Sequence, residues 1–133
     1  MIEVHAGETV EVKNGEFVLV LEGGTATVQR GGTVIVTAGG IATIQVGGYA
    51  TVVAGGRVTI TGGQAEIYAG GHATIEDDGW AEVLDGGKVE VQAGGYALVN
   101  EGAKATVYPG GTASGKGEIT YAELPAEDLA PTV

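Results

Sequence analysis

The sequence contains no cysteine, and its 133 residues include only one Phe, one Met and one Trp. The absence of thiols excludes disulfide bonds, thiolate metal sites and thiol catalysis. Hydrophobic residues make up 44% of the chain, but few of them are large. The core must therefore be thin and built from small and β-branched side chains.

Basic residues are also scarce, since six Lys and Arg stand against 17 Asp and Glu, for a formal net charge of −11. Nucleic-acid binding needs a clustered basic surface, so we expect no nucleic-acid partner. No apolar run approaches the roughly 18 residues of a membrane helix, so we expect no membrane contact. Residues 1–5 lack the basic and apolar regions of a secretory signal, which predicts synthesis in a cytosol without a cleaved leader.

Glycine, in contrast, is abundant and periodic, with 26 residues that recur mostly in pairs. Successive pairs are eight residues apart, except for one step of seven between Gly55 and Gly62. The pairs begin at Gly23, Gly31, Gly39, Gly47, Gly55, Gly62, Gly70, Gly86, Gly94 and Gly110, with degenerate members at Gly7, Gly15, Asp78 and Gly102. This period gives fourteen units and indicates a repeat architecture.

Each unit reads G-G-x-[A/V]-x-[V/I]-x-x, an alternation typical of a β-strand. Positions four and six are predicted to point inward, and positions three, five and seven outward. The glycines mark corners, where a positive φ or a close backbone approach is needed. A single unit cannot bury its inner side, so the units must stack.

The outward residues decide how many units close one coil. When the units are grouped by two, every second unit carries most of the apolar outward residues, whereas grouping by three mixes them. The residues that separate in this way are Phe17, Leu19, Leu21, Ile35, Tyr49, Val53, Tyr68, Trp80, Leu84, Tyr96 and Leu98. A monomer rarely exposes so long an apolar strip, so we predict that these eleven residues form an interface.

We therefore predict an all-β fold, a single-stranded parallel β-solenoid (β-helix or β-roll) of about seven two-sided coils of sixteen residues. The crossovers are expected to be right-handed by default. Residues 1–6 would form an N-terminal cap strand, residues 7–117 the fourteen repeats, and residues 118–133 an acidic extended tail.

The remaining units predict a more polar outer side. Arg57, His72, Lys88 and Lys104 share position three of these units, and a column of threonines occupies position five. Threonine ladders are typical of ice-binding solenoids, but Glu76 and Glu90 interrupt this one along with the basic residues. Ice binding is therefore kept as an alternative.

No catalytic, cofactor-binding or metal-binding residues are predicted. Glu66 and Glu82 would lie on neighbouring coils, near the separation of a retaining glycosidase pair. Catalytic acids need burial or close neighbours to tune them, and a flat outer side offers no enclosed pocket. We therefore expect no enzyme activity and no cofactor.

The repeat resembles the Gly-Gly β-solenoids of bacterial autotransporter adhesin passengers and of bacteriophage virion proteins. The segments Gly23-Gly24-Thr25-Ala26-Thr27-Val28 and Gly31-Gly32-Thr33-Val34-Ile35-Val36 carry this likeness, which covers about residues 7–117. Bactofilin-like cytoskeletal solenoids are similar in kind.

The resemblance favours a structural, non-enzymatic virion-associated protein, either a capsid decoration or cement protein or a spike component. Such a protein would assemble in the host cytoplasm and reside in the virion. Its expected partners are identical subunits, with a trimer favoured, and a capsid or tail protein. The alternatives are a carbohydrate- or surface-binding adhesin module that uses Tyr49, Trp80 and Tyr96 as a stacking row, or an ice-binding or cytoskeletal solenoid.

Overall fold

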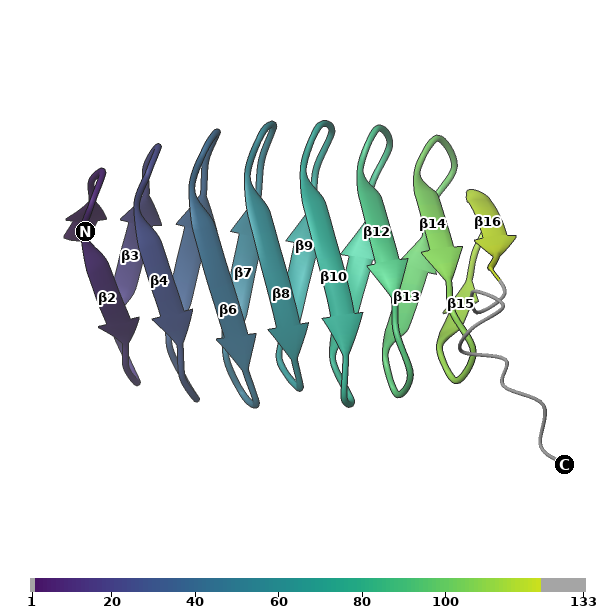
Figure 1. The fold of residues 1–133 in the computed structure, drawn as a ribbon, viewed down its shortest axis with the longest axis horizontal. Coiled ribbons are helices and arrows are strands. Elements are labelled where there is room, and N and C mark those ends of the chain that lie inside the picture. Colours follow the sequence, from purple (N-terminus) through teal and green to yellow (C-terminus); the bar gives the residue numbers. More distant parts are fainter. Residues whose placement is uncertain (1, 123–133) are drawn as a thin grey trace, which may run out of the picture.

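The computed structural model describes residues 2–122, which form sixteen β-strands in two parallel sheets (Figure 1). The odd-numbered strands form the first sheet: β1 (Ile2–Val4), β3 (Phe17–Val20), β5 (Thr33–Val36), β7 (Tyr49–Val52), β9 (Gln64–Ile67), β11 (Trp80–Val83), β13 (Tyr96–Val99) and β15 (Thr112–Ser114). The even-numbered strands form the second sheet: β2 (Thr9–Val12), β4 (Thr25–Val28), β6 (Ile41–Gln45), β8 (Arg57–Thr61), β10 (His72–Glu76), β12 (Lys88–Val91), β14 (Lys104–Val107) and β16 (Glu118–Tyr121).

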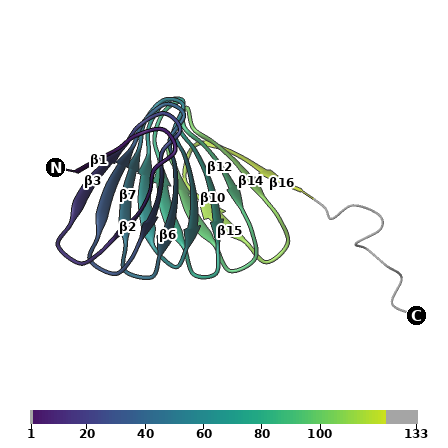
Figure 2. The ribbon, with the colours of Figure 1, turned by 60° about the vertical axis from the view of Figure 1, so that its left-hand side comes forward.

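The chain alternates between the sheets, so each coil contains one strand of each. In most coils residues sixteen apart pair in register, as Trp80 does with Tyr96 and Lys88 with Lys104. In the last coil the separation is fourteen, since Lys104 pairs with Glu118. Figure 2 shows the coils as successive flattened loops, with β1 at one end and β16 at the other. The predicted two-sided parallel β-solenoid is confirmed.

The solenoid extends beyond the predicted limits at both ends. β1 pairs with β3 as an ordinary coil strand, and β16 pairs with β14, four residues past the predicted end at residue 117. Each sheet therefore has eight strands, one more than the predicted seven coils. The assignment of residues 118–121 to a tail was wrong, because these residues continue the backbone ladder. Residues 123–133 of the predicted tail lie outside the described residues.

The core lies between the two sheets and consists of Ala, Val and Ile side chains alone. These side chains come from positions four and six of the units, and the largest that are fully buried are isoleucines, such as Ile44 and Ile60. No polar side chain is buried in the part of the chain that the structure describes. The thin interior therefore excludes water along its length, which favours stacking of the coils.

The seven-residue step leaves the core register intact. Gln64 pairs with Tyr49, fifteen residues earlier, and the inward residues Ala65 and Ile67 still lie beside Ala50 and Val52. The missing residue is therefore lost from the corner after β8, where Gly62 follows Thr61 directly. A corner can lose a residue without reversing the alternation of the next strand.

The two glycines of a pair serve different purposes, as Gly31 and Gly32 illustrate. Gly31 has a φ of 80°, which is the left-handed region that residues with a Cβ rarely adopt. Gly32 is buried against the preceding coil, where a Cβ would lie 2.6 Å from the carbonyl oxygen of Val12. The second glycine thus allows one coil to approach the next.

Glutamate replaces this second glycine in the first two units, at Glu8 and Glu16, where the described chain has no preceding coil. Their Oε1 atoms accept hydrogen bonds of 2.7 Å from the backbone N–H groups of His5 and Lys13. In later coils the equivalent N–H group binds a carbonyl of the preceding coil, as Leu21 binds Val4. The two glutamates therefore cap this edge of the solenoid.

We expect Gly32→Ala to lower the free energy of unfolding by about 1–3 kcal/mol, because the added methyl group would overlap the backbone of Val12. The matched control is Glu16→Ala at the same repeat position in the first coil, which loses only a capping hydrogen bond worth roughly 1 kcal/mol or less. Chemical denaturation of both variants measures the difference. An equally small loss of unfolding free energy in Gly32→Ala and in Glu16→Ala would show that the close approach of the coils does not require the glycine.

Candidate binding surfaces

The eleven predicted interface residues all lie on the outer side of the first sheet or in the corners that follow its strands. None of them is buried. Phe17 and Tyr68 are the most open, with 40% and 39% of their surface exposed, and the other nine are partly exposed. The structure thus places these side chains outward, as predicted. Their role as an interface stays a prediction.

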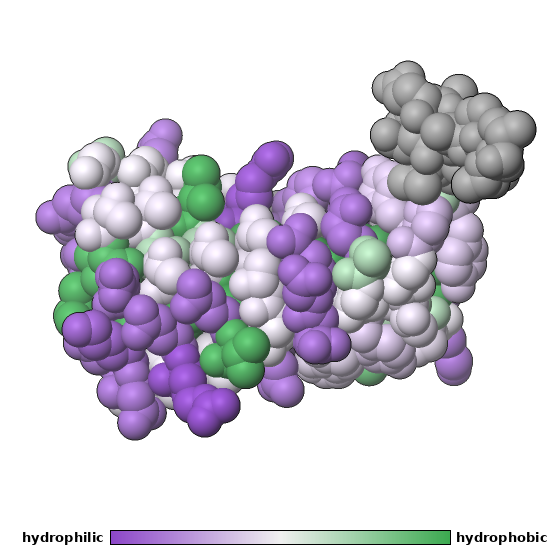
Figure 3. Space-filling view, turned by 60° about the horizontal axis from the view of Figure 1, so that its bottom comes forward, coloured by the Kyte–Doolittle hydropathy of each residue, from purple (hydrophilic) through white to green (hydrophobic). Residues whose placement is uncertain are grey.

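Hydrophobic side chains are divided into separate patches on at least one side of the rod. In the view of Figure 3 they appear as separate patches among hydrophilic and neutral residues. On the first sheet, Phe17, Leu19 and Ile35 lie on the adjacent strands β3 and β5, whereas the later strands carry aromatic and acidic residues side by side.

Trp80 and Tyr96 are direct neighbours on β11 and β13, and both are partly exposed. Tyr49 occupies the same column, but Gln64 of β9 lies between Tyr49 and Trp80. The predicted stacking row is therefore a pair of adjacent rings, followed by an amide and then a third ring. We call the surface formed by these four residues the aromatic column.

Two glutamates lie beside the aromatic column, two residues further along their strands. Glu66 and Glu82 pair in register on β9 and β11, as expected from the repeat. Each carboxylate accepts a hydrogen bond from a neutral donor: Glu66 from the Tyr49 hydroxyl, and Glu82 from Asn100 Nδ2 at 3.1 Å. This arrangement makes the middle of the first sheet amphipathic rather than uniformly apolar.

Most side-chain hydrogen bonds between coils are diagonal. They join a residue of one coil to the residue eighteen positions later, which lies in the next coil and two residues beyond its direct register partner. Tyr96 reaches Ser114 at 2.5 Å, and Gln29 donates to Glu11 at 3.0 Å. His72 and Tyr108 contact Glu90 in the same way, at 3.3 and 3.4 Å. The repeat alignment predicts direct columns but gives no signal for these diagonal contacts, which tie the outer side chains together.

Tyr49 is the titratable residue most affected by this network. Partial burial raises the pKa of its phenol well above the usual value, and the hydrogen bond and negative charge of Glu66 raise it further. The hydroxyl therefore stays protonated and donates to Glu66 through neutral and moderately alkaline pH.

We expect the stability of the protein to fall with rising pH because of Tyr49. Its pKa is higher in the folded protein than in the unfolded chain, so its contribution is present below about pH 10 and is lost as the pH rises above that value. Urea denaturation of the wild type and of Tyr49→Phe on both sides of this pH measures the effect, with the exposed Tyr121→Phe as control. Tyr49→Phe should lose less stability than the wild type as the pH rises above about 10. A pH dependence in Tyr49→Phe equal to that of the wild type would contradict this role of Tyr49.

The outer side of the second sheet is polar, as predicted. Arg57, His72, Lys88 and Lys104 form one continuous column on β8, β10, β12 and β14. The threonine ladder is unbroken from Thr27 on β4 to Thr74 on β10, and Glu90 then interrupts it. A role of this ladder in ice binding stays a prediction.

Among residues 2–122, no group of three or more His, Asp or Glu side chains lies close enough to hold a metal ion. The same residues include no helix able to cross a lipid bilayer.

Comparison with known proteins gives a likeness at the level of structure. No family model matches the chain, and no curated protein matches it. Three chains of solved structures do, among them a TibC-catalysed hyper-glycosylated fragment of TibA, residues 55–350. That fragment is 25% identical, with a TM-score of 0.53 over 84% of this chain. TibA is an autotransporter adhesin, and this chain spans only 59% of the TibA fragment. The similarity agrees with the predicted resemblance to adhesin passenger repeats.

Proposed function

We propose that this chain is a non-enzymatic adhesin module, which holds a flat carbohydrate-binding surface on a rigid solenoid. The observation that carries the proposal is the register of Trp80 with Tyr96 on adjacent strands. The structural similarity to a fragment of the adhesin TibA supports the adhesin class. The same similarity does not bear on the virion role that the sequence favoured.

The chemistry around the ring pair suits a sugar. A pyranose has an apolar C–H side and a rim of hydroxyl groups, and aromatic rings with polar edges match such amphipathic ligands. Gln64 adjoins Trp80 on one side, and Glu82 is two residues further along the same strand. A carboxylate has room for several hydrogen bonds, so Glu82 can accept from a sugar hydroxyl while it accepts from Asn100.

Rigidity is the contribution of the fold to this function. The backbone of β11 is paired with β9 on one side and β13 on the other, and Ala81 and Val83 are fixed in the core beneath the ring pair. A preformed surface loses little conformational entropy when a ligand binds, which favours affinity.

A non-enzymatic role is supported by the state of the two glutamates. Glu66 and Glu82 lie on an open sheet surface, and each accepts a hydrogen bond from a neutral side chain. Catalytic acids are tuned by burial or by close charged neighbours. Neither carboxylate of this pair is buried.

The test is binding of the purified protein to an array of immobilised saccharides. We expect the wild type to retain at least one saccharide, and Trp80→Ala and Tyr96→Ala each to weaken that binding by about tenfold or more, as for buried aromatic anchors. Thr43→Ala on the second sheet is the matched control and should bind as the wild type does. Equal retention of Trp80→Ala and Thr43→Ala would remove the aromatic column from the proposal.

The virion-associated role is the second candidate, favoured by the exposure of Phe17 and Tyr68 on the same sheet. A structural subunit would use these residues to contact identical chains, most simply in a closed ring. Sedimentation of the array sample distinguishes the two: an oligomer that retains no saccharide supports the structural subunit, and a monomer that retains one supports the adhesin module.

A further inference from the structure

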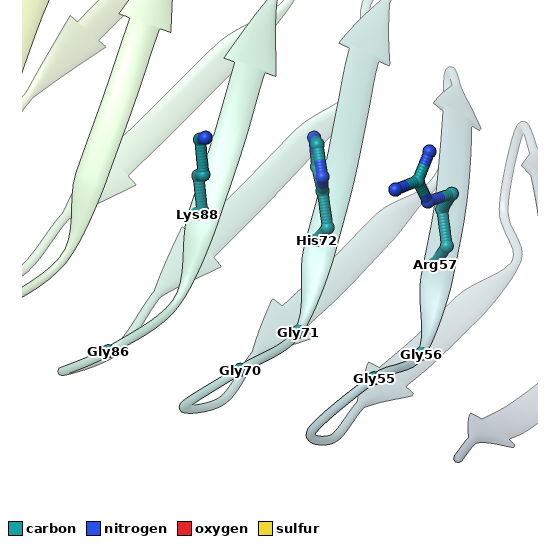
Figure 4. Close-up of a pocket in the computed structure, with 8 residues that line it drawn as sticks. All are labelled: Gly55, Gly56, Arg57, Gly70, Gly71, His72, Gly86 and Lys88. Carbon is teal, nitrogen blue, oxygen red and sulfur yellow. The ribbon is translucent and has the colours of Figure 1, made fainter. Parts of the chain in front are cut away.

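The basic column of the second sheet borders a hollow of about 330 Å³. Figure 4 shows Arg57, His72 and Lys88 side by side on β8, β10 and β12, just after the glycine corners. The hollow is lined by these three side chains and by five glycines, Gly55, Gly56, Gly70, Gly71 and Gly86. It therefore combines cationic groups with a corner that has no side chains of its own.

Three alanines lie against the glycines of the hollow. At this edge, the residue before each glycine pair lies against the first glycine of the next coil. A Cβ added to Gly55 would lie 2.8 Å from the methyl group of Ala38, and one added to Gly70 would lie 2.9 Å from that of Ala54. Ala69 stands in the same way over Gly86. The glycines on either side of this stretch are covered by acidic side chains instead, Gly39 by Glu22 and Gly102 by Asp85. The hollow thus lies where the first glycines of the corners are covered by alanine methyl groups instead of acidic side chains.

The cations at the hollow are largely uncompensated. His72 contacts Glu90 at 3.3 Å, and Lys104, one coil beyond, pairs with Glu118 at 3.7 Å. Within residues 2–122, neither Arg57 nor Lys88 forms a salt bridge. Three of the six Lys and Arg of this acidic chain therefore share one column, and two of them border the hollow without an acidic partner.

We propose that this hollow binds the sulfate or carboxylate group of an acidic saccharide. The planar guanidinium of Arg57 can donate two parallel hydrogen bonds to such a group, while Lys88 adds charge from two strands away. Thr59 and Thr74, two positions along from Arg57 and His72, place hydroxyls where the sugar ring would lie. The site is on the opposite sheet from the aromatic column, so it neither requires nor excludes the proposed function.

The charge of the molecule limits the ligand to a local anionic group. A long polyanion would meet the net charge of −11 beyond the hollow, since at physiological salt the field of the column extends only about 8 Å. A saccharide with one or two acidic groups gains the attraction of the column and avoids most of that repulsion.

The test is calorimetric titration of a sulfated disaccharide, its unsulfated counterpart, a uronic-acid disaccharide and inorganic sulfate. The variant is the double substitution R57Q with K88Q. The matched control is K13Q with K116Q, which changes the net charge equally but lies outside the column. Thermal unfolding checks that both double variants fold.

We expect the wild type and the control to bind an acidic disaccharide, and R57Q with K88Q to lose at least tenfold in affinity. Binding should weaken as salt rises from about 0.05 to about 0.3 M, because the contacts are ionic. The sulfated and uronic-acid ligands decide which group is preferred. Equal affinity of the two double variants, equal binding of the unsulfated sugar, or inorganic sulfate bound as tightly as the sugars would overturn the proposal.

W80A separates this site from the aromatic column. Binding of the acidic disaccharide by W80A at the wild-type affinity assigns the ligand to the hollow and leaves the proposed function to its own test. Loss of that binding in W80A, together with its retention in R57Q with K88Q, would place the ligand on the first sheet and overturn the assignment.

Discussion

The close approach of each coil to the one before it is the contact on which the rest of the structure depends. Backbone N–H groups and carbonyls point along the rod, so every interior strand has its hydrogen-bond partners in the neighbouring coils. The approach is possible because the second glycine of each pair has no Cβ to meet the carbonyl beneath it, as Gly32 has none to meet Val12. The Ala, Val and Ile core then excludes water between the two sheets. Where no coil lies beneath, Glu8 and Glu16 supply the missing acceptors.

Stacking also explains why functional features of this molecule occur as columns. A residue type repeated at one position of the unit becomes a row along the rod, with neighbours about 4.8 Å apart. The ring pair of Trp80 and Tyr96 and the cations Arg57, His72 and Lys88 are both rows of this kind, on opposite sheets. Because each row is fixed by backbone pairing, a ligand would meet groups already in place. The two sides can thus recognise different chemistry, one amphipathic and one anionic.

The repeat made the fold predictable, because the eight-residue period and the alternation of apolar residues are both encoded locally. The two-sided coil followed from the apolar outward residues, and the pairing of Glu66 with Glu82 followed from the register. The strands β1 and β16 were missed as coils because neither begins with a glycine pair. The sequence also gave no sign that the Tyr49 hydroxyl reaches Glu66, since that contact joins different positions of two coils. The glycines of the hollow lie against small corner residues, and an alanine in a corner carries no signal of its own.

Paired cysteine substitutions test the two-unit coil most directly, because the chain has no cysteine of its own. Residues 88 and 104 are register partners on β12 and β14, within the Cα separation that a disulfide spans. We expect Lys88→Cys with Lys104→Cys to form an intramolecular disulfide on mild oxidation, and Lys88→Cys with Thr112→Cys, which lie on opposite sheets, to form none. Cross-linking of residue 88 to residue 112 but not to residue 104 would mean three units in each coil, and would contradict the account.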